Sequence, residues 1–369
     1  MTDGDRADPL HVPHGRLRAQ VARHVLIEDG GNAVIDWCRY GEDVYLFKRF
    51  REEHRNVVDE AALVRLVLWR RSLPPDRRSR LDTFTAWPRY VVRDGDGRVA
   101  GVLIPAAGHR FFRATWDGRL TPRGLYVLLG VGGRPGVPVP ERIRVLARLI
   151  GAVRWLHRCG VVVNDLQPEN LLYSVDGRDT AVYIVDCDSM VSVRHWGRVA
   201  PPAAPDLMTE VLPAGTEPTV EADLTKLFWL VTRVVLDDPS VTGLGARDEA
   251  ELFAAVPGHS RGHLSALVRD PTDAAAWDAL VEAWHAAPPS PPPQPPEPLA
   301  QRQDPGRGWL PPGWSYRPAP GPPVLPARLR GGPVLPGGRA LAMTALVGCL
   351  AGLASLLSVL AMALLSGGR

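Results

Sequence analysis

The chain has 369 residues, enough for two or three domains or for one domain of about 250 residues with extensions. Apolar residues make up 45% of the chain, which excludes a wholly disordered protein. The 43 basic and 40 acidic residues leave a net charge of only +3, so we expect no nucleic-acid partner. The four cysteines are far apart and include no C-x-x-C pair, so neither a disulfide scaffold nor a structural zinc site is expected.

One bias in the composition points to individual residues. The 43 basic residues comprise 41 arginines and only two lysines, Lys48 and Lys226. This depletion of lysine, beside abundant Ala, Arg, Gly, Pro and Val, is typical of a GC-rich coding sequence. Where drift favours arginine, a retained lysine more often needs a compact ammonium that a guanidinium cannot imitate. The bias therefore adds weight to either lysine wherever a second line of evidence reaches it.

The chain begins with a polar segment. Residues 1–20 contain no apolar run of the signal-peptide type, so we predict no secretory signal and expect this segment to be disordered. Over 21–286, apolar runs alternate with turn signals, which predicts one folded unit. Its first part contains a Gly-containing turn at 29–34, a strand, a turn at Gly41 and a second strand that ends in Lys48.

Three oxygen-bearing side chains gather in the middle of the chain. A helix is predicted to end near His157, and the strand-like run 161–163 leads into a loop that carries Asp165 and Asn170. Two more apolar runs, 171–173 and 181–185, predict a hairpin that delivers Asp186 to the same place. Carboxylate and amide oxygens are hard ligands suited to Mg²⁺, and phosphoryl transfer needs little beyond such positioning and charge neutralisation.

Two motifs in this region carry a family resemblance. Residues 163–170 read Val-Asn-Asp-Leu-Gln-Pro-Glu-Asn and 186–188 read Asp-Cys-Asp. Here the chain resembles the Hanks-type (eukaryotic-like) serine/threonine protein kinases of bacteria, whose motifs are H-R-D-L-K-P-x-N and D-F-G. The D-x-D-S form of the second motif looks like a divergent branch of them. The resemblance implies ATP and Mg²⁺ as cofactors, Asp165 as catalytic base, and Asn170 and Asp186 as Mg²⁺ ligands.

The same resemblance implies a fold and further roles. The fold would be α+β and two-lobed, with a small β-rich N-lobe over about 21–105 and a mainly α C-lobe over about 106–286. Lys48 would grip the α- and β-phosphates, and Glu60 would pair with Lys48. Structural support would come from Asp206, in an A-P-D that resembles the family's A-P-E, and from Asp223, which would brace the catalytic loop. The remaining ATP-binding positions would be Gly30, Gly31, Val34, Ile104 and Pro105.

Three departures from the family pattern qualify these roles. Asn164 replaces the arginine that usually reads activation-loop phosphate, so control by phosphorylation of that loop is not expected. Gln167 replaces a lysine that helps neutralise the γ-phosphate, which should lower the rate without abolishing it. Asp188 replaces the glycine of D-F-G and removes a flexible pivot.

The C-terminal part has a different character. Residues 287–339 hold 18 of the 37 prolines and predict an extended linker. A 26-residue uncharged run follows, and we predict a transmembrane helix over 340–366. Arginines are more frequent before it than after it, which predicts a single-pass protein of the cell membrane, with the kinase-like domain cytoplasmic and the C-terminus outside. Gly348 and Gly352 form a G-x-x-x-G that could equally be a dimerisation face or chance spacing.

Three functions remain open from the sequence. The first is an active protein kinase that transfers the γ-phosphate of ATP to Ser or Thr hydroxyls of protein substrates. The second is a nucleotide-binding pseudokinase scaffold, favoured by the degenerate glycine turn and Gln167. The third is a small-molecule phosphotransferase of the aminoglycoside-kinase type, which has a similar short loop and an aspartate-rich metal motif.

Overall fold

The computed structural model divides the chain into two units, residues 1–320 and 321–369. It describes residues 10–19, 33–114, 120–128, 137–176, 179–192, 194–199, 211–213 and 215–286. Several predictions fall outside these described residues: the linker 287–339, the membrane helix 340–366 and the positions Gly30, Gly31, Asp206, Gly348 and Gly352.

The first part of the fold is a six-stranded sheet with the strand order β1-β5-β6-β4-β3-β2. All neighbouring strands are antiparallel except β1 and β5, which run parallel. The predicted pair of strands around Gly41 is confirmed as the β3–β4 hairpin. The strands are β1 (His11–Pro13), β2 (Arg18–Ala19), β3 (Ala33–Tyr40), β4 (Asp43–Phe50), β5 (Tyr90–Arg93) and β6 (Val99–Ile104).

The N-terminal segment departs from the expected disorder. Within 1–20, His11–Pro13 forms β1 on the edge of the sheet, and Arg18–Ala19 forms β2 on the opposite edge. Val12 is fully buried there, in a small apolar cluster that it shares with Phe47 and Val92. An edge strand offers unpaired backbone groups, and one buried valine supplies apolar area, so a short segment can dock although its composition is polar.

Three helices lie between β4 and β5: α1 (Glu52–Arg55), α2 (Glu60–Ser72) and α3 (Pro75–Phe84). The α2 helix begins after Asp59, whose carboxylate accepts a hydrogen bond of 3.0 Å from the Ala62 N–H and so caps the helix. One face of α2 is buried and includes Leu63, Leu66 and Trp69. Helix α2 therefore packs with this face toward the sheet, where it contacts β5, and its first turn is fixed by the Asp59 cap.

A cluster of three indole rings links α2 to distant segments. Trp69 on α2 lies 4.8 Å from Trp87 and 5.4 Å from Trp196, measured between ring centroids. The Trp87 N–H donates to the Leu66 carbonyl at 3.1 Å, and the Trp196 N–H donates to the Met190 carbonyl at 2.9 Å. Packing and hydrogen bonds together tie α2 both to the chain before β5 and to the segment that follows the predicted metal loop.

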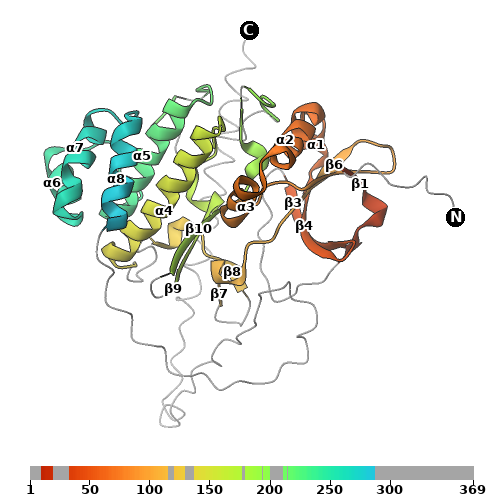
Figure 1. The fold of residues 1–369 in the computed structure, drawn as a ribbon, viewed down its shortest axis with the longest axis horizontal. Helices are drawn as coiled ribbons and strands as arrows, with labels where there is room; N and C mark the ends of the chain where they lie inside the picture. Colours follow the sequence, from red (N-terminus) through yellow and green to blue (C-terminus); the bar gives the residue numbers. More distant parts are fainter. Residues whose placement is uncertain are drawn as a thin grey trace, which may run out of the picture. The chain divides into compact units, whose positions relative to one another are not determined.

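The second part of the fold is mainly helical, which confirms the expected α+β composition. The α4 helix contacts α5 and α8, and α5 contacts α6 (Figure 1). The predicted helix end near His157 is confirmed, since α4 ends at Arg158. No helix of the described residues is both long and apolar enough to cross a membrane. The helices are α4 (Val139–Arg158), α5 (Val220–Leu236), α6 (Ala246–Ala255), α7 (Arg261–Arg269) and α8 (Ala274–Ala286).

Two hairpins and several short turns complete the described fold. The predicted hairpin is confirmed as antiparallel β9 and β10, which contact α4. A second small hairpin is formed by β7 and β8. The hairpin strands are β7 (Phe112–Ala114), β8 (Leu120–Pro122), β9 (Leu171–Asp176) and β10 (Asp179–Ile184). The 3₁₀ turns are His14–Arg16, His109–Phe111, Leu125–Leu128, Pro168–Asn170, Cys187–Ser189 and Gly258–Ser260.

Gly101 is required where β6 pairs with β4 beside Lys48. A Cβ at this position would overlap the Lys48 carbonyl oxygen and approach the Arg49 Cα to 3.0 Å. Both neighbours are backbone atoms of a paired strand and cannot move independently. We expect Gly101→Ala to destabilise the fold by about 1–3 kcal/mol in urea unfolding, the usual cost of overpacking. Gly95→Ala is the matched control, because no atom lies within 4 Å of the added methyl, and an equal loss in both variants would contradict this account.

Candidate active site

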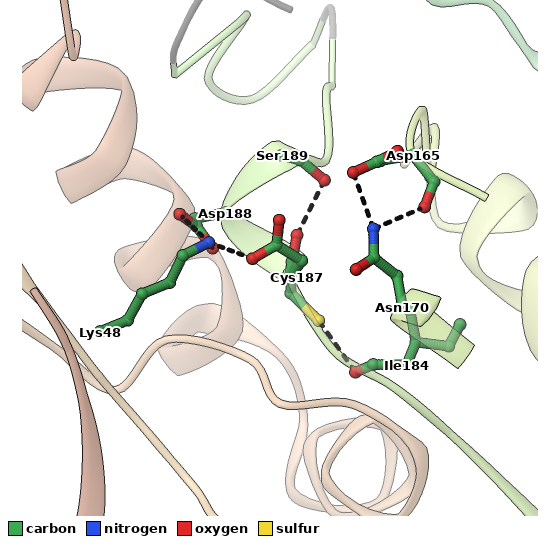
Figure 2. Close-up of polar contacts among 8 residues, drawn as sticks. Lys48, Asp165, Asn170, Ile184, Cys187, Asp188 and Ser189 are labelled. Carbon is green, nitrogen blue, oxygen red and sulfur yellow. Dashed lines mark hydrogen bonds and ion pairs between the residues drawn. The ribbon is translucent and has the colours of Figure 1, made fainter. Parts of the chain in front are cut away.

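Lys48 lies at the centre of the candidate site. It is carried by β4 opposite Ile35 of β3 and Val102 of β6, and the residue is only 8% exposed. Its ammonium contacts the Asp186 carboxylate and donates to both oxygens of Asp188, at 2.8 and 2.9 Å (Figure 2). The sheet and the predicted metal loop, 138 residues apart in the chain, therefore meet at this lysine.

The charges of this cluster depend on each other. Burial by itself would lower the pKa of Lys48, but Asp186 and Asp188 outweigh it and raise that pKa above its ordinary value, so the ammonium stays charged. Burial also raises the pKa of the Asp188 carboxyl, with Asp186 adding to the shift and Lys48 opposing it. One cation therefore faces two acidic groups, and the cluster is suited to receive further positive charge.

A tight turn presents Asp186. This residue has φ 62°, in the left-handed region that non-glycine residues seldom adopt, and the 3₁₀ turn Cys187–Ser189 follows it. The Ser189 hydroxyl donates to the Asp186 carbonyl at 2.8 Å and fixes the turn. Burial raises the pKa of the Cys187 thiol, which donates to the Ile184 carbonyl at 3.4 Å, so this cysteine is a small packing residue and not a nucleophile.

Asp165 and Asn170 are held together on the preceding loop. Asn170 donates through Nδ2 to Asp165 Oδ2 at 2.7 Å, and Gln167 donates through Nε2 to Asp165 Oδ1 at 2.8 Å. Each carboxylate oxygen of Asp165 thus accepts a hydrogen bond from a side-chain amide of the same loop. The loop therefore fixes the orientation of the Asp165 side chain.

The two loops contact each other directly. The Val185 N–H donates to the Asn170 carbonyl at 2.9 Å, and Asn164 donates through Nδ2 to the Ser189 carbonyl at 3.2 Å. In Figure 2, Cys187 and Ser189 lie between the Lys48–Asp188 pair and the Asp165–Asn170 pair. The structure thus brings all four residues of the expected phosphoryl-transfer set, Lys48, Asp165, Asn170 and Asp186, to one place.

Asp223 holds the loop that carries Asp165 through hydrogen bonds, as expected from the resemblance. This residue is 1% exposed on α5 and accepts hydrogen bonds from the N–H groups of Val163, at 2.6 Å, and Asn164, at 2.8 Å. It also accepts from Nε2 of His157 at 2.9 Å, since a carboxylate can only accept. Three donors thus converge on one buried carboxylate, which fixes the residues just before Asp165.

Lys226, one turn further along α5, also reaches this loop. Its ammonium donates to the Asn164 carbonyl at 2.7 Å. Asn164 has φ 67°, a conformation that asparagine tolerates better than most residues. Both lysines of the chain therefore lie at the candidate site. The scarcity of lysine in the sequence points to Lys226 as well as to Lys48. No motif accompanies Lys226, so the sequence alone could not assign it to the site.

The expected pairing of Glu60 with Lys48 is wrong. Glu60 is the first residue of α2, and its carboxylate pairs with Arg93 of β5 and lies 3.7 Å from His11 Nε2 of β1. Lys48 instead pairs with Asp186 and Asp188. Arg93 competes for the glutamate from β5, which is separated from the Lys48 strand by β6, and the spacing between Glu60 and Lys48 could not reveal that competitor.

The expected nucleotide-contacting positions are only partly described. Val34 lies in β3 opposite Arg49 and is half-buried. Ile104 is buried at the end of β6 opposite Leu46, and the half-buried Pro105 follows it. These three residues lie on strands that flank β4 or directly follow such a strand, as the resemblance implies, while Gly30 and Gly31 lie outside the described residues.

The oxygen-bearing side chains of the site suit an Mg²⁺ ion that is also bound by a nucleotide better than a metal held by protein ligands alone. No group of three or more His, Cys, Asp or Glu side chains arranged to hold a metal occurs within the described ranges. Mg²⁺ bound to a nucleotide commonly uses one or two carboxylates together with phosphate oxygens. Asp186 and the Asn170 amide are oxygen-bearing groups of this kind, and two carboxylates around the single Lys48 ammonium favour a further cation there.

No family model matches the chain. Serine/threonine-protein kinase H1 from Homo sapiens, and its counterparts from Bos taurus and Mus musculus, are 40% identical over 57 residues, which is 15% of this chain and 13% of theirs. A crystal structure of the PknI kinase domain of Mycobacterium tuberculosis has 15% identity and a TM-score of 0.45, and the similarity covers 74% of this chain and 96% of that one.

The curated relatives and the solved structure are protein kinases by name, and the two similarities cover different shares of the chain. The chain spans about an eighth of the length of the curated relatives that it matches, and the identity is confined to 57 residues. What those proteins do as a whole is therefore not transferred to this chain by the match. The geometry around Lys48 is the independent observation from which a function can be argued.

Proposed function

We propose that the chain is an ATP-dependent protein kinase that transfers the γ-phosphate to Ser or Thr hydroxyls. The observation that carries the proposal is the meeting of Lys48, Asp186, Asn170 and Asp165 at one site, from a strand and two loops. A cation for the nucleotide phosphates, oxygen ligands for Mg²⁺ and a carboxylate for the acceptor hydroxyl are the parts that phosphoryl transfer uses.

Each residue has a task in this proposal. The Lys48 ammonium neutralises charge on the α- and β-phosphates, and Asp165 accepts the proton of the attacking hydroxyl while Asn170 and Gln167 hold its carboxylate in place. Asn170 and Asp186 would hold Mg²⁺, which supplies charge neutralisation to the β- and γ-phosphates when bound. Asp223 keeps the loop of Asp165 fixed through its backbone N–H groups.

The test is transfer of labelled γ-phosphate by the full-length protein with Mg-ATP. We expect label on the protein itself or on generic Ser/Thr-containing acceptor proteins, and none with Lys48→Met, because the phosphate-binding cation is then lost. A panel of hydroxylated metabolites runs beside the proteins. Labelling of metabolites alone would refute the protein-kinase proposal in favour of a small-molecule phosphotransferase.

A pseudokinase scaffold is the second candidate, and one observation favours it. Gln167, which stands where the family has a phosphate-binding lysine, donates its amide to Asp165 Oδ1 and supplies no charge. Binding of Mg-ATP in a thermal-shift assay, together with no transfer to any acceptor, would support this candidate over the active kinase.

The proposed membrane tether over 340–366 and dimerisation through Gly348 and Gly352 remain sequence predictions, because these residues lie outside the described ranges.

A further inference from the structure

The buried partner of Lys48 is Asp188, which belongs to the same short segment as the predicted metal ligand Asp186. Asp188 receives hydrogen bonds from the Lys48 ammonium at both carboxylate oxygens, at 2.8 and 2.9 Å. The Lys48 and Asp188 side chains are 10% and 9% exposed, whereas the Asp186 side chain, the other partner of Lys48, is 36% exposed. Asp188 therefore lies behind the lysine, away from solvent, and Asp186 is the carboxylate accessible to a ligand.

Helix α2 supplies no acid to this lysine. Its first residue, Glu60, is engaged by Arg93 of β5 and lies near His11 of β1. The rest of the helix start is held elsewhere: the Asp59 N–H donates to the Val199 carbonyl at 2.7 Å, and Arg65 donates to the Trp196 carbonyl at 3.2 Å. A move of Glu60 to Lys48 would have to break these contacts.

We propose that Asp188 is the residue that positions the Lys48 ammonium for nucleotide phosphates, in place of the helix glutamate. The inference rests on the proposed kinase function and names a positioning residue for it. Asp188 acts through Lys48 and does not itself touch the reacting atoms. It explains why a glycine position of the family motif carries a buried carboxylate here.

The division of tasks follows from charge. Two carboxylates and one ammonium leave one negative charge in excess, and a metal-bound nucleotide offers Asp186 a second cation. When Asp186 turns to that cation, Asp188 still holds Lys48 through both oxygens, so the lysine keeps its position. Both carboxylates belong to one short stretch, 186–188, so the lysine and the metal ligand are positioned by the same turn.

His54 of α1 is a further titratable group near the pair, in addition to the buried Cys187 thiol. It interacts electrostatically with Lys48, Asp186 and Asp188, and its own pKa is lowered by burial. At pH 8 it is therefore neutral, and the charge balance around Lys48 is set by the two carboxylates. A measurement at this pH reports on Asp186 and Asp188 without a contribution from a charged His54.

The experiment uses the lysine content of the chain. Full-length wild type and the variants Asp188→Asn, Asp188→Glu and Glu60→Gln are treated with acetic anhydride at pH 8, without nucleotide or metal, and modification is followed by mass spectrometry. Lys48 and Lys226 are the chain's two lysines, so Lys226 serves as the internal reference. Affinity for Mg-ADP is measured in parallel by calorimetry.

We expect Asp188→Asn to speed modification of Lys48 relative to Lys226 by about tenfold, because the ammonium loses the buried carboxylate that holds it with both oxygens. Affinity for Mg-ADP should fall by about tenfold in the same variant. Glu60→Gln should match the wild type within twofold in both measurements, and Asp188→Glu should recover part of the affinity because it restores the charge.

Two results would overturn the proposal. One is equal modification of Lys48 in Asp188→Asn and wild type; an Mg²⁺ requirement altered only in that variant would then make Asp188 a metal ligand. The other is a Glu60→Gln variant that behaves like Asp188→Asn. A wild type that binds no nucleotide would refute the kinase function itself, whereas the modification rates, which need no nucleotide, would still decide whether Asp188 holds Lys48.

Discussion

Asp165→Asn is expected to reduce phosphoryl transfer by about 10²–10⁴-fold, the contribution of a positioned general base. The substitution keeps the shape of the side chain but removes the carboxylate that accepts the hydroxyl proton. Asn170 and Gln167 hold this side chain at 2.7 and 2.8 Å, so the loop has little freedom to bring another base into place. Initial rates with labelled ATP give the loss, and calorimetry with Mg-ATP should show affinity within about threefold of wild type.

The control for this variant is Asp36→Asn. Asp36 is on β3, its side chain is half exposed, and it pairs with Arg49 at 3.4 Å at the surface. Such exposed pairs contribute little, so the rate should stay within twofold of wild type. Full activity of Asp165→Asn, or equal losses in the two variants, would contradict the assignment of Asp165 as base.

Asp223→Ala is expected to destabilise the protein by about 3–5 kcal/mol and to abolish measurable transfer. The substitution leaves three donors without their acceptor in a buried place: the N–H groups of Val163 and Asn164 and the His157 ring. The residues that precede Asp165 then lose their support, so activity should fall even where the variant remains folded. Urea unfolding measures the free energy, and rates below the unfolding transition measure the transfer.

Asp278→Asn is the matched control in the same helical part. Asp278 on α8 accepts two hydrogen bonds from Arg154, at 3.0 and 3.1 Å, but its side chain is 46% exposed. Water reaches Asp278, and the asparagine oxygen can still accept from the buried Arg154, so the loss should be only about 1 kcal/mol. Comparable losses in the free energy of unfolding for Asp223→Ala and Asp278→Asn would contradict the attribution of the larger loss to the burial of Asp223.

The elements around the site could be predicted because their signals are local. The β3–β4 hairpin has a turn residue, Gly41, with φ 61° between apolar runs, and β9 and β10 flank their own turn. The convergence of Asp165, Asn170 and Asp186 follows from short connections along the chain. Lys48 could be added because its motif and its rarity agree.

What could not be predicted depends on partners far away in the chain. The choice of Lys48 between Glu60 and Asp188 is decided by Arg93, which takes the glutamate, and no spacing rule contains that competition. The docking of β1 depends on one buried residue, Val12, at an edge whose accessibility only the folded sheet defines. Lys226 reaches Asn164 only because Asp223 holds the loop against α5.

The indole cluster of Trp69, Trp87 and Trp196 has a consequence for how such a protein could be controlled. A buried indole of about 150–250 Å² costs about 4–6 kcal/mol to expose at about 25 cal/mol per Å². A swing of α2 that uncovered one of these rings would then be populated in at most about one molecule in a thousand. We therefore expect the rate of phosphoryl transfer to depend on the amount of the protein and on its encounters with acceptors. A rapid displacement of α2 is not expected to control this rate.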